Sequence, residues 1–265
     1  MNDPILCELR GPVALLTLNR PDTRNALSGE AMFAAFEQLF ERLNADLSVG
    51  VAVLTGAGSA FCSGGNVAEM RNRSGMFGGS PEQIAVNYRV GIQRIPRAFQ
   101  GLHVPIIAAV NGAAIGAGND LACMCDIRIA SSTARFAESF VKVGIVPGDG
   151  GCWLLPRVVG MSRAAELALT GDTIDADEAL RMGLVSRVVA PEALMIEAMK
   201  LADRIAANPP QVLRWTKQLL QQARTGSLDE ALDTAGRFQG LAHHTADHTE
   251  AVTAFFEKRT PVFGR

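Results

Sequence analysis

The sequence predicts an α/β fold that ends in a C-terminal helical segment. Two stretches, residues 51–70 and 105–126, share one order: a short apolar strand, a polar residue followed by glycine, and a loop of small residues that enters a helix. Beyond Pro191 the strand patterns stop and the apolar residues recur at helical spacing. With 265 residues, 48% of them hydrophobic and 20% charged, the chain is long and apolar enough for a substantial core.

Composition and charge exclude several classes of protein. The formal net charge of −2 leaves no electrostatic footprint for nucleic acid, and the most apolar window, residues 104–118, is interrupted by Asn111 and several glycines, so no membrane span is predicted. The N-terminal Met-Asn-Asp-Pro lacks a basic stretch followed by an apolar one, and we expect a cytoplasmic protein. The five cysteines include no CxxC pair and mostly lie in apolar runs, so neither disulfides nor a zinc site is expected.

The N-terminal elements are two strands and a helix. Residues 6–9 and 13–18 are predicted to be strands around a Gly-Pro turn, which is a hairpin pattern. A polar loop over residues 19–27 then ends at Ser28, the expected N-cap of the next helix. That helix is predicted to bury Met32, Phe36, Leu39, Phe40 and Leu43.

The stretch after the strand 106–110 offers a place for a negatively charged oxygen. Asn111-Gly112 and a loop of Gly and Ala follow this strand, and a helix is expected from about Gly118. A ligand can approach a loop that lacks bulky side chains, and the free N–H groups of a first helical turn carry the positive end of the helix dipole. Asp120 in that turn is either a partner of the dipole or an acid/base group.

The stretch 51–70 repeats this order, with a strand at 51–55, a Gly-rich loop at 56–65 and a helix from Asn66. If the two units lie side by side, their backbone N–H groups converge on one oxygen, as an oxyanion hole requires. The alternative is that glycine-rich turns between strands and helices are simply common in α/β proteins. Neither loop has a Walker lysine or fits the dinucleotide fingerprint, so no nucleotide cofactor is predicted.

Short elements fill the rest of the first 190 residues. Glycines, prolines and the spacing of apolar residues predict a mobile loop at 71–79, a helix over 81–99, a strand at 127–130, an extended segment at 135–141 and a loop at 143–151. Two helices are predicted next, one over 162–169 that stops at Gly171 and one from Asp175 to about Gly183 that begins with capping-box residue types. The last of these elements is a strand at 184–189.

Residues 191–265 are predicted to form a helical oligomerisation region, and residues 1–190 the core domain. Helices are expected over 191–207, over 210–223, and from the capping box that begins at Ser227 to about Lys258. Amphipathic helices that follow a strand-rich body often bury their apolar stripe against another subunit. We therefore expect a homo-oligomer.

A histidine-rich segment within this helical region carries no metal-binding pattern. His244 and His248 are four residues apart, with His243 and Asp247 beside them. A metal site needs a further well-placed ligand, and none is evident. We interpret the segment as a solvated helix face and predict no metal.

Five motifs in the same order resemble the enoyl-CoA hydratase/isomerase (crotonase) family over essentially the whole chain. The motifs are the central stretch 105–126 together with Ala60-Phe-Cys-Ser-Gly-Gly-Asn-Val, Pro147-Gly-Asp-Gly-Gly, Leu169-Thr-Gly-Asp and Phe255-Phe-Glu-Lys-Arg. The resemblance implies a spiral of ββα repeats, assembly into a homotrimer or hexamer through the C-terminal helices, and an acyl-CoA thioester as substrate. It implies no cofactor other than the coenzyme A carried by the substrate.

The resemblance also assigns binding roles. Two backbone N–H groups, those of Gly65 and Ala117, are implied to hold the thioester carbonyl oxygen. Chemistry beside a thioester carbonyl places negative charge on that oxygen, which fixed donors stabilise. Lys258 and Arg259 are candidates for the coenzyme A phosphates, or else are favourable charges at a helix C-terminus. The remaining residues implied to contact coenzyme A or the thioester are Arg24, Ala26, Leu27, Ser63, Gly64, Asn66 and Val67.

The catalytic carboxylates depart from the family pattern. Hydratases of the family commonly use two glutamates, of which the first aligns with Asp120 and the second with Phe140. A phenyl ring cannot transfer a proton, so we expect Phe140 to line the substrate site instead. Glu138 and Asp149 are the nearby substitutes. The alternatives are that Glu138 pairs with Arg135 and that Asp149 serves its turn.

These residues predict an enzyme that stabilises an enolate or related oxyanion of an acyl-CoA, of the hydratase or isomerase type. Because the second family glutamate is absent, decarboxylation, thioester hydrolysis and carbon–carbon cleavage stay open as other reactions of the same site. From a different class, the alternative is a non-catalytic protein that binds coenzyme A thioesters.

Overall fold

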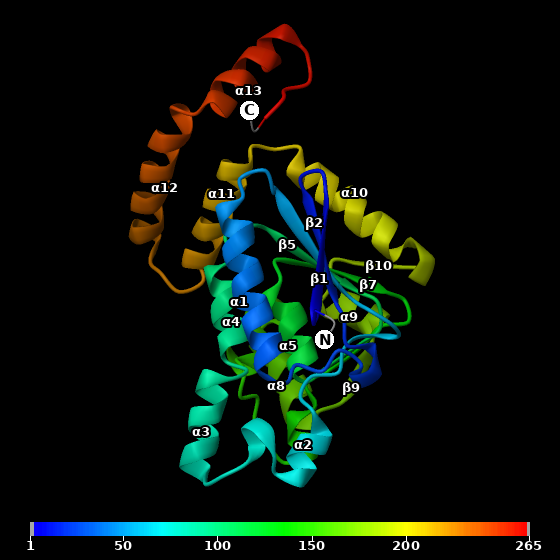
Figure 1. Ribbon diagram of the computed structural model, residues 1–265. Helices are drawn as coiled ribbons and strands as arrows, with labels where there is room; N and C mark the ends of the chain where they lie inside the picture. The colour runs from blue at the N-terminus through cyan, green and yellow to red at the C-terminus, as the bar shows by residue number, and fades with distance from the viewer. Residues whose placement is uncertain (1–2, 264–265) are drawn as a thin grey trace.

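The computed structural model describes residues 3–263 and arranges them as two sheets surrounded by helices (Figure 1). Within these residues the larger sheet has the order β1-β2-β3-β5-β7-β10, formed by Ile5–Arg10, Val13–Leu18, Val51–Gly56, Ile106–Val110, Ile127–Ser131 and Arg187–Val189. The smaller sheet has the order β4-β6-β8-β9, formed by Ala60–Cys62, Ala113–Ile115, Arg135–Ala137 and Thr173–Asp175. The predicted α/β class is confirmed.

Successive pairs of strands build the two sheets as a spiral. β3, β5 and β7 each add a parallel strand to the larger sheet, and the strand that follows each of them, β4, β6 or β8, adds one to the smaller sheet. The helices α2 (Val67–Asn72) and α5 (Ala117–Met124) follow β4 and β6. The repeat predicted from residues 51–70 and 105–126 is therefore present, and the N-terminal hairpin β1–β2 is antiparallel as predicted.

The sequence patterns were wrong about several short elements. The loop predicted after Asn111 contains β6, whose three small residues carry no strand pattern of their own and are fixed by pairing with β4 and β8. The segment predicted as extended over 135–141 is a strand only to Ala137, and residues 139–143 form a 3-10 turn. The predicted strand at 184–189 begins only at Arg187. The Gly-rich loop predicted over 56–65 contains β4. The elements β9, α6 (Gly151–Leu154) and α7 (Pro156–Val159) had no prediction.

Helix boundaries and breaks also differ from the predictions. The helix α1 (Glu30–Ala45) buries all five predicted residues, but its N-cap is Gly29, and Ser28 does not cap it. The predicted helix over 81–99 is two helices, α3 (Pro81–Val90) and α4 (Arg94–Gly101), because the chain leaves helical geometry at Gly91. The last predicted helix is likewise divided into α12 (Leu228–His243) and α13 (Ala246–Glu257). Thr245 separates them and caps α13 with its side chain.

The remaining helices agree with the predicted spans to within a few residues. They are α8 (Met161–Thr170), α9 (Ala176–Met182), α10 (Leu194–Ala206) and α11 (Pro210–Gln222). Gly171 and Gly183 adopt the left-handed conformation that ends α8 and α9, and Ser227 and Glu230 form the predicted capping box of α12. Among residues 3–263, no helix combines the length and apolarity needed to cross a bilayer.

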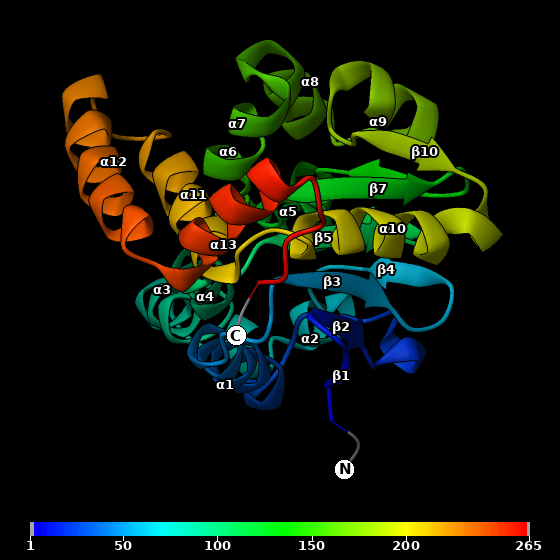
Figure 2. The ribbon, with the colours of Figure 1, turned by 90° about the horizontal axis from the view of Figure 1, so that it is seen from above.

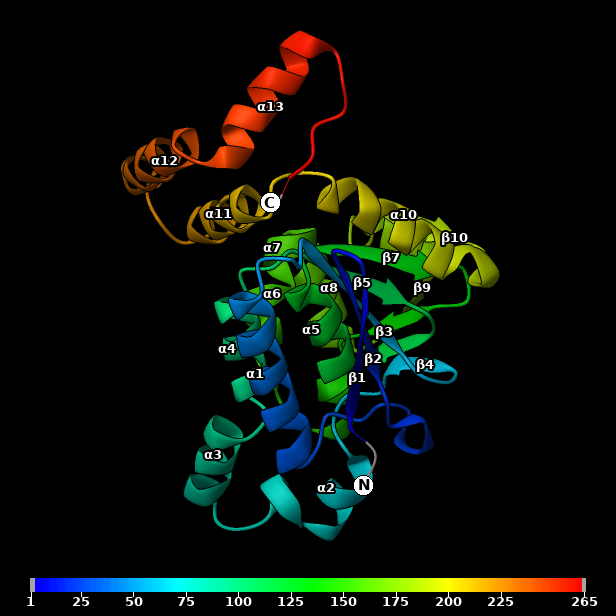
Figure 3. The same ribbon diagram turned by 45° about the horizontal axis from the view of Figure 1, so that its top comes forward.

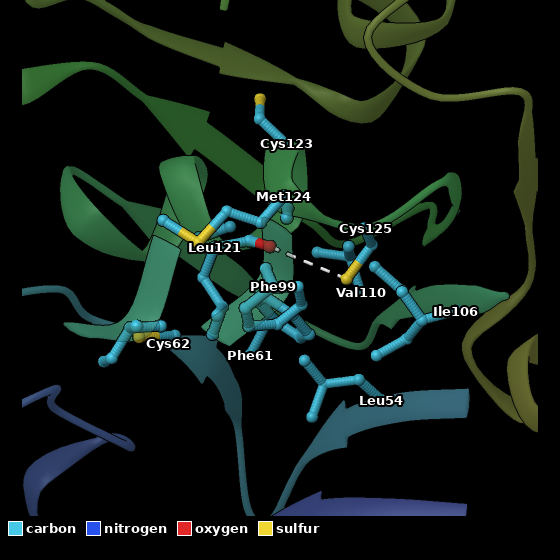
Figure 4. Packing of buried hydrophobic residues seen from close by; sticks show 14 of the residues in the cluster. Leu54, Phe61, Cys62, Phe99, Ile106, Val110, Leu121, Cys123, Met124 and Cys125 are labelled. Atoms are coloured by element: carbon cyan, nitrogen blue, oxygen red, sulfur yellow. Dashed lines mark hydrogen bonds between the residues drawn. The ribbon is translucent and has the colours of Figure 1, made fainter. Parts of the chain in front are cut away.

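The larger sheet is covered on both faces. Its main core packs against α1, α4 and α5, and Figure 4 shows Phe61 and Phe99 within it together with Leu121 of α5. Cys125 belongs to this core, and its Sγ donates to the Leu121 carbonyl at 3.6 Å (Figure 4). On the other face, α10 lies along the sheet (Figure 2) and buries Leu194, Ala198 and Ala202.

The C-terminal helices leave the core progressively. α11 is anchored by two buried cations: Arg214 donates to the carbonyls of Leu43, Asp46 and Val49, and Lys217 pairs with Asp126 at 2.9 Å. α12 and α13 extend away from the sheets (Figures 1 and 3). α10 and α11 thus pack on the body of the molecule, and the predicted division at residue 190 stays a prediction.

Candidate active site

The N-terminus of α5 is docked on β4 by glycines that admit no side chain. A Cβ on Gly118 would lie 2.0 Å from the Cys62 carbonyl oxygen. Gly116 has φ 54° and ψ −121°, a conformation that residues with a Cβ avoid. Its N–H donates to the Ala137 carbonyl at 2.7 Å, which ties the start of α5 to the smaller sheet. Backbone, not side chains, therefore fixes the position of this helix end.

The two predicted oxyanion donors belong to segments that lie against each other. Gly64 has φ 81°, and a Cβ built on it would be 3.1 Å from the Ala117 nitrogen. Among the described residues, neither the Gly65 N–H nor the Ala117 N–H donates a hydrogen bond. Two backbone donors are thus available beside each other at the end of a helix, where the dipole favours negative charge.

The residues implied to bind coenzyme A lie in two segments joined by hydrogen bonds. Ser63 N–H donates to the Arg24 carbonyl at 2.9 Å, and Leu27 N–H donates to the Gly64 carbonyl at 2.8 Å. Leu27 and the neighbouring Ala26 are buried, and the Arg24 side chain is exposed. Asn66 accepts hydrogen bonds from the first turn of α2 as its N-cap, and the next residue, Val67, is exposed.

Lys258 and Arg259 lie elsewhere in the chain. They follow α13, which Figure 1 shows at the opposite end of the molecule from α2. Arg259 pairs with Glu250 and Glu257. The structure therefore does not bring these two cations to the other predicted coenzyme A residues within one chain, and their phosphate-binding role stays a prediction.

Three carboxyl groups from three parts of the chain gather beside the start of α5. Asp120, Glu138 and Asp149 are 0%, 1% and 2% exposed. The Cβ position of Gly151 lies 2.3 Å from Glu138 Oε1 and 2.6 Å from both carboxyl oxygens of Asp120, so only a glycine leaves these groups room. Asn119 Nδ2 donates to Glu138 Oε2 at 3.0 Å. Within the described chain Glu138 makes no ion pair with Arg135.

Burial and mutual repulsion keep protons in this cluster. Burial raises the pKa of Asp120 well above its ordinary value, and the charges of Asp149 and Glu138 raise it further. Burial raises the pKa of Glu138 to about 7, opposed by the hydrogen bond from Asn119. Burial also raises the pKa of Asp149, opposed by a hydrogen bond with Asp120. The raised pKa values of these three carboxyl groups allow the cluster to hold a proton at a higher pH than separate, exposed carboxyl groups would.

Aromatic rings flank the two backbone donors. The Phe140 ring comes within 3.7 Å of the Cβ position of Gly116, one residue before Ala117. The Phe77 ring comes equally close to the Cβ position of Gly65 and contacts the Tyr88 ring edge to face, with centroids 6.2 Å apart. The expectation that Phe140 lines the substrate site is consistent with this position but stays a prediction.

Asn119 and Gly151 are site residues that had no role in the predictions. Gly151 is in the predicted loop motif 147–151, but nothing in the motif says that two carboxyl groups converge on it. Asn119 precedes Asp120 in the first turn of a buried helix, and a buried amide next to a candidate acid was the available signal.

The histidine pair differs from the predicted one. The helix is interrupted at His244, between α12 and α13, so His243 and His248 face each other across the interruption. The distance between His243 Nδ1 and His248 Nε2 is 3.0 Å. Both side chains belong to the α12–α13 region, away from the carboxyl cluster (Figure 1). No group of three or more His, Cys, Asp or Glu side chains within residues 3–263 is arranged to hold a metal ion.

Paired backbone donors next to buried carboxyl groups define a class of enzyme, one that stabilises negative charge on a carbonyl oxygen while it transfers a proton. Comparison with known proteins identifies the family within this class. The model of the enoyl-CoA hydratase/isomerase family matches residues 8–265. The short-chain-enoyl-CoA hydratase of Clostridium acetobutylicum is 38% identical, over 96% of this chain and 95% of that protein.

Two further relatives show the range of the family. The 1,2-epoxyphenylacetyl-CoA isomerase of Escherichia coli is 37% identical, over 99% of both chains. The crystal structure of an enoyl-CoA hydratase from Bacillus anthracis superposes with a TM-score of 0.90 at 34% identity, covering 98% of each chain. The chain belongs to the enoyl-CoA hydratase/isomerase family, and the predicted crotonase-like fold and enzyme type are confirmed.

Proposed function

We propose that this enzyme binds an acyl-CoA thioester with its carbonyl oxygen between the N–H groups of Gly65 and Ala117. Negative charge that develops on that oxygen is stabilised by two fixed donors and by the dipole of α5. Loss of one such donor typically raises the barrier by about 3–4 kcal/mol. In this binding mode the coenzyme A part of the substrate lies against segments 24–27 and 63–67, which hydrogen bonds join to each other.

One observation carries the proposal: two backbone N–H groups without acceptors lie one helical turn from three buried carboxyl groups. Ala117 and Asp120 are three residues apart in the first turn of α5. A thioester oxygen held at Ala117 therefore brings the neighbouring carbon atoms toward Asp120, Glu138 and Asp149.

The carboxyl cluster supplies the acid and the base. In hydration of a 2-enoyl thioester, the base takes a proton from water as the water oxygen bonds to C3, electrons move onto the thioester oxygen, and the acid protonates C2. In isomerisation of a 3-enoyl thioester, the base removes a proton from C2 and a proton returns at C4. Both reactions pass through an enolate whose negative charge lies on the thioester oxygen, a 3-hydroxyacyl enolate in hydration and a dienolate in isomerisation.

We assign Asp120 as the proton-transfer group nearest the enolate. Glu138 takes the place of the second family glutamate, and Asp149 shares a hydrogen bond with Asp120. Glu138 is supported by its burial, its pKa of about 7 and its position beside Asp120, whereas Phe140 has no proton to transfer. No cofactor is required besides the coenzyme A of the substrate, because the cluster itself provides acid and base.

We further propose a cytoplasmic homotrimer or hexamer assembled through the C-terminal helices. Large apolar side chains on these helices are exposed in the single chain: Phe255 and Phe256 at 78% each and Leu228 at 73%. Rings that are this exposed in one chain favour burial against a second copy.

Incubation with a panel of saturated, 2-enoyl, 3-enoyl, malonyl-type and aryl acyl-CoAs in heavy water tests the function. Mass spectrometry would report products and deuterium uptake together. We expect deuterium at C2 with saturated or enoyl substrates, and a hydrated or isomerised product from one enoyl class. Decarboxylated, hydrolysed or cleaved products would instead identify one of the other reactions. Tight binding of coenzyme A thioesters without exchange or turnover across the panel would identify a binding protein.

A further inference from the structure

Asn119 is a buried amide in the first turn of α5, next to Asp120. It is 1% exposed, and its Nδ2 donates to Glu138 Oε2 at 3.0 Å. Its backbone N–H donates to the Gly116 carbonyl at 2.8 Å. The glycine that shapes the helix start therefore also fixes the amide that reaches Glu138.

The surroundings of Glu138 offer it few other donors. Asp120 and Cys123 face it from α5, Asp149 from the loop before α6, and Cys152 lines the same apolar pocket as Glu138 between α6 and α8. None of these groups is a cation. Within residues 3–263, Asn119 supplies the amide donor to Glu138 Oε2, and the other hydrogen-bonding neighbour of the Glu138 carboxyl group is Asp120.

We propose that Asn119 is a positioning residue, which holds Oε2 of Glu138 so that Oε1 stays turned toward Asp120 and the Gly151 backbone. This inference rests on the proposed function, in which Glu138 replaces the second family glutamate. An amide N–H stabilises an ionised carboxylate more than a protonated one, so Asn119 keeps Glu138 available as a base inside a cluster that otherwise favours its protonated form.

A purely structural role fits Asn119 poorly. A buried asparagine that serves packing and stability satisfies both ends of its amide, but Asn119 Oδ1 accepts no hydrogen bond from any protein group in residues 3–263. The single bond that it does make is directed at Glu138. Removing the amide is therefore expected to change the ionisation of Glu138 more than the stability of the fold.

The substitution Asn119→Leu tests the proposal, with Asn44→Leu as a control. Asn44 also bonds backbone groups through its side chain, at Gly101 and His103, but lies outside the carboxyl cluster. The first readout is titration of the Glu138 carboxyl carbon by NMR in protein labelled with ¹³C-glutamate, the signal being assigned by its loss in Glu138→Gln. We expect the Glu138 pKa to rise by about one unit in N119L, as loss of a hydrogen bond to a charged group implies, and to stay unchanged in N44L.

The second readout is the pH profile of turnover. In N119L the pKa of its acidic limb should rise by the same amount as the Glu138 pKa. A Glu138 titration that is identical in N119L and the wild type, or that moves equally in N44L, would overturn the proposal. If N119L does not fold, Asn119→Ala removes the amide without added bulk and takes its place. The NMR titration needs no substrate, so an absence of turnover in the wild type would count against the proposed function alone.

Discussion

In the proposed mechanism, Asp120 is the residue on which the chemistry depends most. It sits in the first turn of α5, where an ionised carboxylate would be a good partner for the helix dipole, yet burial and two neighbouring carboxylates raise its pKa. Burial is the largest cause of this shift, and the repulsion within the cluster adds to it. A carboxyl group kept protonated in this way is suited to donate a proton beside a carbonyl group.

The substitution Asp120→Asn should slow exchange of the C2 proton of bound acyl-CoA by about 10²-fold or more, the usual contribution of a positioned acid or base. Binding of coenzyme A thioesters should change little, since the backbone donors remain. Asp203→Asn on α10, an exposed carboxylate, is the matched control. The measurement is the rate of C2-proton exchange in heavy water. Equal exchange rates in D120N and D203N would show that Asp120 does not take part in the proton transfer.

The same cluster makes stability depend on pH. Because the Glu138 pKa is raised in the folded state, from 4.5 to about 7, the native protein binds more protons than the unfolded chain in this interval. The contribution is fully present below pH 4.5 and is lost as the pH rises through 7. We predict that the free energy of unfolding falls across this interval by on the order of 3 kcal/mol.

Urea unfolding of the wild type and Glu138→Gln at several pH values between 5 and 8 measures this effect. The variant should show a shallower fall, since its amide has no proton to lose. Equal slopes of stability against pH in the wild type and Glu138→Gln would show that the Glu138 pKa is not raised in the folded state.

At the scale of elements, the docking of α5 on β4 determines where the Ala117 N–H points. Gly118 permits that contact because it has no side chain. In Gly118→Ala the new Cβ would meet the Cys62 carbonyl at 2.0 Å, so β4 and α5 must separate. We predict a loss of about 1–3 kcal/mol in the free energy of unfolding, typical of an overpacked core, together with a fall in turnover.

Gly236→Ala provides the control, because this glycine lies within α12 and has no other atom within 4 Å of its Cβ position. An alanine there should stabilise the protein by about 0.5–1 kcal/mol, as expected for a helix interior. Thermal unfolding of both variants compares them directly. If G118A were as stable and active as the wild type, the close approach of β4 and α5 would not be required.

Sequence patterns identified the long elements and missed those that depend on distant contacts. The buried face of α1 and the strands β3 and β5 follow from local periodicity alone. The three-residue strands β6 and β9 exist because neighbouring strands pair with them, so no local pattern predicts them. The residue types of the site were recognisable, but the convergence of Glu138 and Asp120 on Gly151, and the bond from Asn119, depend on tertiary structure.

At the scale of the whole molecule, the C-terminal helices divide into two pairs. α10 and α11 complete the body, since α10 covers one face of the larger sheet and α11 inserts Arg214 and Lys217. α12 and α13 reach outward from the body (Figure 3). Their large apolar side chains include Leu228, Phe255 and Phe256, which are exposed. The first pair therefore serves folding, and the second pair carries the contacts of the proposed assembly.

Ending the chain after Ala223 should leave a folded monomer, whereas ending it after Ala190 should give aggregated protein, because the latter uncovers the apolar residues beneath α10. Circular dichroism and light scattering report the two properties separately. Persistence of the wild-type oligomer in the chain ending at Ala223 would place the subunit contacts elsewhere in the molecule.

In the proposed mechanism the thioester carbonyl is held by the backbone N–H groups of Gly65 and Ala117, which alanine scanning cannot remove. Infrared difference spectroscopy of an acyl-CoA labelled with ¹³C at the carbonyl measures this interaction at the bond concerned. We predict that the carbonyl stretch of the bound thioester lies below its frequency in water, because two fixed donors at a helix N-terminus polarise it more than solvent does. A bound carbonyl with the frequency found in water, or a higher one, would contradict the account.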